Sequence, residues 1–282
     1  MDHESHRLRP DRLLSQNRAP FWLDGGAVGV LLLHGFTGRA DELRPLGDAL
    51  HAAGYTAYGP SLAGHDRYFP DGLKGLPWQA WLRGAERAFD TLYHRTPRVF
   101  VVGQSLGGTL GTLLAQSRPV AGLVTMGAPL TFPTWIRVVA SVAGPCVPWF
   151  YPFAIANLDD PRIRVQVQAF VPDVDFADPA TRAAIKKEIR IPLSAIAELG
   201  QALPYARRRV PYVATPTLVL QGRHDPLTRA TDAHLLFGLL GSADKQLVWF
   251  EQSGHLLLAG SEHEAVIRAV VRFIDERAAF PG

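Results

Sequence analysis

The stretch VFVVGQSLGG, from Val99 to Gly108, decides the fold of this chain. It opens with an apolar run rich in β-branched residues, which is typical of a strand buried on both faces of a parallel sheet. The glycines around Ser105 permit a sharp turn from strand to helix with a strained residue at its tip. A helix is predicted over 109–116, so the Ser105 hydroxyl is expected above a helix N-terminus. The G-x-S-x-G pattern in this setting predicts that Ser105 is a nucleophile.

Strand and helix patterns alternate on both sides of this stretch. Apolar runs predict strands at 21–23, 28–33, 55–59, 120–126, 217–221 and 246–250. Helical spacing of apolar residues predicts helices at 41–53, 78–93, 230–240 and near the C-terminus. Such alternation predicts an α/β fold with a mostly parallel, doubly wound sheet covered by helices on both faces.

The alternation breaks over residues 131–210, a proline-rich stretch with helical patterns at 135–143, 179–190 and 193–203. A helical insertion of this size between two sheet strands is interpreted as a cap. The predicted organisation is a core of 20–130 and 211–282, with the cap at 131–210. Residues 1–19 are polar and charged, and they are interpreted as a flexible arm.

Composition and net charge indicate which classes of protein this sequence fits and which sites it lacks. The 282 residues are 47% hydrophobic and 20% charged, with a net charge of +3, as in an ordinary globular protein without a nucleic-acid-binding surface. Cys146 is the only cysteine, which excludes an intrachain disulfide and a C-x-x-C metal site. The N-terminus lacks the apolar core of a signal peptide, and prolines interrupt the most apolar segment, 135–156. We expect a cytoplasmic protein without stable membrane insertion.

A serine nucleophile needs a histidine base that is oriented by a carboxylate. In an open parallel sheet, these partners are expected just past the carboxyl ends of later strands. Asp225 follows the strand that ends at Gln221, and His255 follows the strand that ends at Phe250. The chain order Ser105, Asp225, His255 is that of the α/β-hydrolases, so we predict that these residues form a catalytic triad.

Other histidines and aspartates compete for these roles. His224 is adjacent to Asp225, and neighbouring residues rarely aim at one point. His34 and His65 follow earlier strands and are expected to stabilise loops through hydrogen bonds. Asp232 and Asp244 fall on a helix or at a turn, where solvent exposure is expected.

An oxyanion hole requires two converging hydrogen-bond donors. Leu106 follows the nucleophile and is expected to supply one backbone N–H. The loop His34-Gly35-Phe36-Thr37-Gly38 follows the strand expected beside that of Ser105, and the N–H of Phe36 is the candidate for the second donor. The alternative is that this loop is only a glycine-rich connection.

Apolar side chains of the cap have two possible roles, which are packing of the cap on the core and lining of an acyl pocket. The candidates for substrate binding are Trp135, Val138, Trp149, Phe150 and Phe153.

The motifs LLLHGFTG, GYTAYGPSLAGH, GQSLGG, VTMGAP, LQGRHD and EQSGH, in this order, resemble those of the bacterial carboxylesterase/monoacylglycerol lipase family of α/β-hydrolases. The resemblance covers 21–126 and the chain from Pro211 to the C-terminus, and it fades in the cap. It implies hydrolysis of short- to medium-chain esters, including monoacylglycerols, without cofactor or metal. Ser105, Asp225 and His255 match the family's triad, and Phe36 and Leu106 match its oxyanion hole.

Two departures from the family pattern limit what the resemblance implies. Asp66 stands where many relatives have glycine, and the cap is longer than in members with a small lid. A thioesterase, a C–C bond hydrolase and a perhydrolase use the same apparatus and remain alternatives, as does a non-catalytic ligand-binding protein. The expected partner is a small ester or lipid-like substrate, and the oligomeric state is left open.

Overall fold

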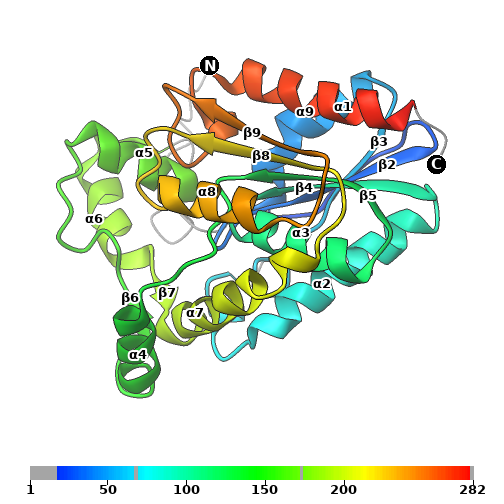
Figure 1. The fold of residues 1–282 in the computed structure, drawn as a ribbon. Coiled ribbons are helices and arrows are strands. Elements are labelled where there is room, and N and C mark those ends of the chain that lie inside the picture. The colour runs from blue at the N-terminus through cyan, green and yellow to red at the C-terminus, as the bar shows by residue number, and fades with distance from the viewer. Residues whose placement is uncertain (1–17, 67–68, 172–173, 280–282) are drawn as a thin grey trace, which may run out of the picture.

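The computed structural model describes residues 18–66, 69–171 and 174–279, and a seven-stranded sheet forms its centre (Figure 1). The strand order is β1-β3-β2-β4-β5-β8-β9, in which only β1 pairs antiparallel with its neighbour. The strands are β1 (Phe21–Leu23), β2 (Val28–Leu33), β3 (Thr56–Gly59), β4 (Arg98–Gln104), β5 (Val120–Met126), β8 (Thr217–Gly222) and β9 (Lys245–Phe250). The mostly parallel sheet predicted from the sequence is confirmed.

Helices cover both faces of the sheet because each central strand is apolar on both faces. In β2, Leu31 and Leu33 pack with α2 (Trp78–Tyr93) and α3 (Leu106–Ser117). The alternate residues, Val30 and Leu32, pack on the opposite face. That face is covered by α1 (Arg44–Ala52) and α9 (His263–Ala278), whereas α8 (Ala230–Leu239) lies on the side of α2 and α3 (Figure 1).

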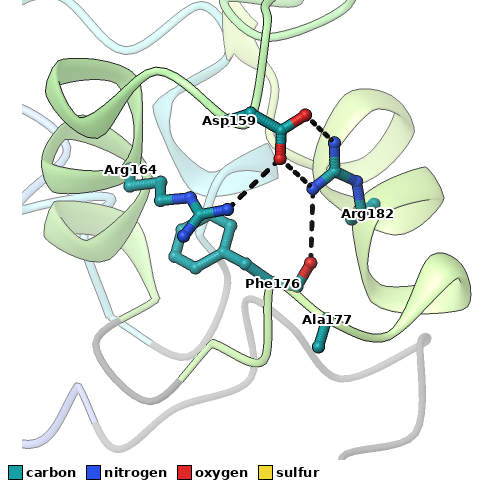
Figure 2. A pocket seen from close by; sticks show the side chains of 5 residues that line it. All are labelled: Asp159, Arg164, Phe176, Ala177 and Arg182. Carbon is teal, nitrogen blue, oxygen red and sulfur yellow. Dashed lines mark hydrogen bonds and ion pairs between the residues drawn. The ribbon is translucent and has the colours of Figure 1, made fainter.

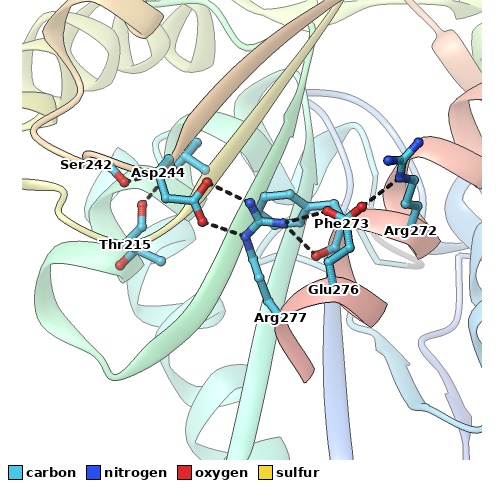
Figure 3. Close-up of polar contacts among 8 residues, drawn as sticks. Thr215, Ser242, Asp244, Arg272, Phe273, Glu276 and Arg277 are labelled. Atoms are coloured by element: carbon cyan, nitrogen blue, oxygen red, sulfur yellow. Dashed lines mark hydrogen bonds and ion pairs between the residues drawn. The ribbon is translucent and has the colours of Figure 1, made fainter. Parts of the chain in front are cut away.

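An ion pair ties α9 to the sheet at the amino end of β9 (Figure 3). The Arg277 guanidinium donates to both carboxylate oxygens of Asp244, at 2.6 and 2.9 Å. Its carbon lies 3.9 Å from the ring centroid of Phe273. The contact holds the last helix against the sheet at the edge opposite to the carboxyl ends of the strands.

The segment between β5 and β8 forms a helical insertion with a small core of its own. Its elements are α4 (Thr134–Ala143), β6 (Trp149–Phe150), α5 (Pro161–Phe170), α6 (Pro179–Glu188), β7 (Ile191–Pro192) and α7 (Leu193–Arg207). Helices α4, α5 and α6 gather to one side of the sheet (Figure 1). Leu158, Val167 and Ile185 are among the buried residues of this separate core, whereas Ala195 and Ala202 of α7 belong to the main core.

Three of the four insertion helices match predicted helical patterns, and α5 was not predicted. Asp160 and Pro161 begin α5, and the Asp160 carboxylate accepts a hydrogen bond from the Arg162 N–H. Among the described residues, no helix combines the length and the apolar composition that are needed to cross a membrane.

The predicted arm, 1–19, lies almost entirely outside the described residues. Its last two residues are described, and Arg18 is only 5% exposed.

Candidate active site

Ser105 occupies the turn between β4 and α3, with φ of 52° and ψ of −119°. A residue with a Cβ adopts this backbone conformation at a cost of roughly 1–3 kcal/mol. The turn needs its glycines, because a Cβ on Gly103 would lie 2.3 Å from the backbone of Gly107. The Ser105 N–H donates to the Met126 carbonyl at 2.8 Å, which ties the turn to β5. The strand–turn–helix geometry predicted around Ser105 is confirmed.

Asp225 and His255, which are 30 residues apart, meet beyond the carboxyl ends of β8 and β9. The Nδ1 atom of His255 lies 2.8 Å from Oδ2 of Asp225, and the two side chains are 12% and 1% exposed. The N–H groups of Leu227 and Thr228 each donate to the other carboxylate oxygen at 2.8 Å.

The environment of Asp225 keeps its carboxyl group ionised. Burial on its own raises the pKa of this carboxyl. Hydrogen bonds from His255 and from the amides of Thr228 and Leu227 favour the charged form, and together they hold the pKa below its usual value. The site therefore provides a fixed negative charge on the Nδ1 side of His255.

Residues that the sequence reasoning missed hold this pair next to the Ser105 turn. The Nε2 of Gln104 donates to the His255 carbonyl at 2.8 Å, and the Nε2 of Gln221 donates to Oδ2 of Asp225 at 3.0 Å. Gly127 lies against both Asp225 and His255. A Cβ on this glycine would be 3.3 Å from Oδ2 of Asp225 and 3.4 Å from Nδ1 of His255. Gln104 is the last residue of β4 and Gln221 is the penultimate residue of β8, and a polar residue at the carboxyl end of a buried strand is the signal that could have identified both.

The loop 34–38 passes beside Ser105. A Cβ on Gly35 would lie 3.2 Å from Cβ and 3.8 Å from Oγ of Ser105, and one on Gly107 would lie 2.0 Å from the Leu33 carbonyl oxygen. Leu106 is the first residue of α3, where a backbone N–H has no partner within the helix. The Phe36 ring packs against the Trp81 ring, with the two centroids 5.6 Å apart. The structure thus brings both predicted oxyanion segments to Ser105.

Two buried histidines brace this loop, as predicted. The Nε2 of His34 accepts a hydrogen bond from the Leu62 N–H at 3.0 Å, and the Nε2 of His65 accepts one from the Thr37 N–H at 3.1 Å. Burial lowers the pKa of His34 to about 4 and lowers the pKa of His65 well below its ordinary value. Both rings are therefore neutral near pH 7, and the unprotonated Nε2 of each ring accepts a backbone hydrogen bond.

The remaining polar candidates hydrogen-bond to residues other than Ser105. Asp232 is 3% exposed and accepts a hydrogen bond from the Leu130 N–H at 3.2 Å, so its predicted solvent exposure is wrong. The reason is that α8 turns this carboxylate inward, onto the segment after β5. Asp244 is half-exposed and pairs with Arg277 (Figure 3). His224 is exposed, and its N–H donates to Ser253.

The apolar cap residues have unequal surroundings. Trp135 and Val138 are 68% and 50% exposed on α4, and Phe150 is 48% exposed. Trp149 is half-buried beneath the Arg190 guanidinium, at 4.1 Å from the ring centroid. Phe153 is buried in the separate core of the insertion. Packing on the α/β core thus does not account for the exposed members, and their role in substrate binding stays a prediction.

A cavity of about 480 Å³ lies within the insertion (Figure 2). Asp159 sits between Arg164 and Arg182 and accepts hydrogen bonds from both, while Phe176 and Ala177 complete the lining. The two guanidinium groups share the single carboxylate of Asp159, so the charged lining carries a net positive charge.

Comparisons with known proteins agree with this architecture. The chain is 26% identical over 260 residues to the thermostable monoacylglycerol lipase of Bacillus sp. (strain H-257), covering 92% of this chain and 95% of that protein. It is 27% identical over 263 residues to a carboxylesterase of Bacillus subtilis (strain 168), covering 91% and 96%. These relatives confirm the resemblance drawn from the motifs.

Solved structures share the fold. One, from work on the metagenome-derived lipolytic enzymes LipS and LipT, superposes with a TM-score of 0.73 at 24% identity, covering 93% of this chain and 99% of that one. The monoacylglycerol lipase of Paleococcus ferrophilus superposes with a TM-score of 0.70 at 19% identity, covering 92% and 98%. The sequence profile of one family, described as serine aminopeptidase, S33, matches residues 27–262. The chain therefore belongs to the serine aminopeptidase S33 family of α/β-hydrolases.

Proposed function

We propose that this protein is a serine hydrolase of carboxylic esters that works through an acyl-enzyme on Ser105. The observation that carries the proposal is the contact between Asp225 and His255 at the carboxyl edge of the sheet, next to a serine held at φ of 52°. The similarity to a monoacylglycerol lipase and a carboxylesterase supports esters as the substrate class.

Each group has one role in the proposed mechanism. The Oγ of Ser105 attacks the ester carbonyl, and Nε2 of His255 takes its proton and then delivers it to the leaving alcohol. Asp225 accepts the hydrogen bond from Nδ1–H and stabilises the imidazolium. The N–H groups of Leu106 and Phe36 hold the oxyanion. A water molecule, activated by His255, then releases the acid.

The insertion, residues 131–210, is proposed as a cap over the acyl site. The proposed substrates are short- to medium-chain esters, with monoacylglycerols among them, and a cytoplasmic location is proposed from the sequence. Because each buried methylene contributes about 0.8 kcal/mol, the rate should rise roughly fourfold per added carbon until the pocket is full.

The test combines covalent labelling with a substrate series. A fluorophosphonate probe should label wild-type protein on Ser105, and p-nitrophenyl esters from acetate to octanoate should be hydrolysed with kcat/KM rising toward medium chains. Ser105→Ala should lose both labelling and turnover while its circular dichroism spectrum is unchanged. Faster turnover of acyl-CoA or of a vinylogous diketone than of every ester would assign a thioesterase or a C–C bond hydrolase instead. Retained activity in Ser105→Ala would exclude the proposed mechanism.

A further inference from the structure

Arg18 is a buried cation beside the proposed oxyanion loop, just before β1. Its Nη1 donates to the carbonyl of Gly38 at 3.0 Å and to that of His65 at 3.4 Å, with a longer contact to the carbonyl of Thr37 at 3.5 Å. The guanidinium carbon lies 3.7 Å from the ring centroid of Phe69. A single side chain thus ties the loop 34–38 to the loop that carries His65.

The arginine remains charged although it is only 5% exposed. Burial and the neighbouring Arg39 lower the pKa of Arg18 to about 10, while Glu42 and Asp41 act in the opposite direction. At neutral pH the group is therefore protonated. A buried cation is costly unless hydrogen bonds and charges compensate it, and here the compensation comes from the loop carbonyls together with Glu42 and Asp41.

The carbonyls of Thr37 and Gly38 belong to a strained segment. Thr37 has φ of 65°, and within the described ranges the only other non-glycine residue with positive φ is Ser105. For a β-branched residue this conformation is a real outlier, and it persists only where the surroundings fix it. Two contacts fix Thr37. Its N–H donates a hydrogen bond to His65, and Arg18 donates to the carbonyls of Thr37 and Gly38.

We propose that Arg18 is a positioning residue for the oxyanion loop: by holding the Thr37–Gly38 carbonyls against His65, it keeps the Phe36 N–H aimed at the oxyanion beside Ser105. The inference rests on the proposed function, since it concerns the same site. A donor that is fixed in advance stabilises a transition state without reorganisation, whereas a relaxed loop loses that advantage. The three carbonyl contacts all come from Nη1, so a lysine ammonium can replace part of them, but it lacks the planar guanidinium that lies over the Phe69 ring.

The test compares Arg18→Met and Arg18→Lys with a matched control, Arg44→Met. Arg44 also lies over an aromatic ring, that of Phe21 at 5.5 Å, but it is half-exposed on α1 and pairs with Asp48. Turnover of p-nitrophenyl butyrate is expressed per serine labelled by the fluorophosphonate, so that unfolded protein does not enter the rate. The inhibition constant of phenylboronic acid, which forms a tetrahedral adduct on serine, is measured for each variant.

For Arg18→Met we expect kcat to fall about 10- to 100-fold, less than the loss of a whole donor, with KM within about threefold of wild type. The inhibition constant of the boronic acid should rise in parallel, because the adduct uses the same donors. Arg18→Lys should lie between Arg18→Met and wild type, and Arg44→Met should match wild type.

Equal kcat per labelled serine in wild type and Arg18→Met would overturn the inference, as would a fall in kcat without any change in boronic acid affinity. If Arg18→Met does not fold, kcat per labelled serine and the boronic acid inhibition constant of Arg18→Lys are compared with those of wild type instead. Failure of the wild-type protein to hydrolyse esters or to react with the probe would overturn the proposed function itself, and that result is distinct from any variant's behaviour.

Discussion

Nδ1 of His255 lies 2.8 Å from Oδ2 of Asp225, although the two residues follow different strands of the sheet. The remaining hydrogen bonds of the Asp225 carboxylate come from donors only, namely Gln221 Nε2 and the amides of Leu227 and Thr228. The carboxylate is therefore held as an acceptor, and it can orient His255 only with the proton on Nδ1.

Replacing Asp225 with asparagine should stop catalysis with little change in shape. An amide group in this position faces donors on every side, so its NH2 would compete with the Nδ1–H of His255 and favour the wrong tautomer. We expect kcat for p-nitrophenyl butyrate to fall by about 10⁴. Asp244→Asn is the matched control, because Asp244 pairs with Arg277 at the opposite edge of the sheet (Figure 3). Comparable losses in the two variants would contradict the role of Asp225.

Gly127→Ala should disturb the pair without replacing a catalytic group. The new Cβ would lie 3.3 Å from Oδ2 of Asp225 and 3.4 Å from Nδ1 of His255, and the residue has φ of 58°. Gly54→Ala has the same kind of strain, with φ of 90°, but nothing lies within 4 Å of its Cβ. Both variants should lose about 1–2 kcal/mol of stability in urea unfolding, which is the cost of the left-handed conformation. Only Gly127→Ala should lose kcat, and a similar loss in Gly54→Ala would refute this explanation.

The backbone N–H of Phe36 and its side chain can be tested separately. Phe36→Ala keeps the N–H and should mainly change KM or packing against Trp81. Phe36→Pro removes the donor, and the preceding Gly35 has no Cβ to clash with the proline ring. Loss of one oxyanion donor costs about 3–4 kcal/mol, or roughly 10²–10³ in kcat. Thermal melts check that both variants fold. Equal kcat values in the two variants would show that the Phe36 N–H does not bind the oxyanion.

Protonation of His34 should make the wild-type fold sensitive to acid. The folded-state pKa of His34 is about 4, below the value of about 6.5 in an unfolded chain. Between these values the unfolded state binds the proton and the folded state does not, so stability falls as pH falls from about 6.5 toward 4. The contribution of His34 amounts to about 2 kcal/mol between pH 7 and 5.

Urea unfolding of wild type and His34→Gln at pH 7 and pH 5 measures this contribution. Other groups, such as Glu42, whose pKa burial raises to about 7, act on both proteins and cancel in the comparison. The free energy of unfolding of wild type should fall more than that of His34→Gln. An equal fall in the two proteins would mean that His34 is not the acid-sensitive group.

Local signals in the sequence determined the sheet, its helices and the strand-to-helix turn at Ser105. Their physical basis is local: apolar runs follow the period of a strand or helix, and glycines mark close backbone contacts. The positions of Asp225 and His255 followed from one further rule, that the carboxyl ends of parallel strands share an edge. Their contact with each other is a finding of the structure, and their catalytic role with Ser105 is a prediction.

Only the tertiary structure decided the contacts between segments that are distant in the chain. Arg18 lies in a polar stretch with no periodicity, and nothing local indicates that it becomes buried against Gly38 and His65. The sequence predicts Asp232 as an exposed helix residue, but in the folded chain its carboxylate accepts a hydrogen bond from the Leu130 N–H. Such side chains are fixed by hydrogen bonds to backbone C=O or N–H groups, and these groups are the same in nearly all residue types. The sequence pattern therefore carries no mark of the partner, and only the folded chain brings the two together.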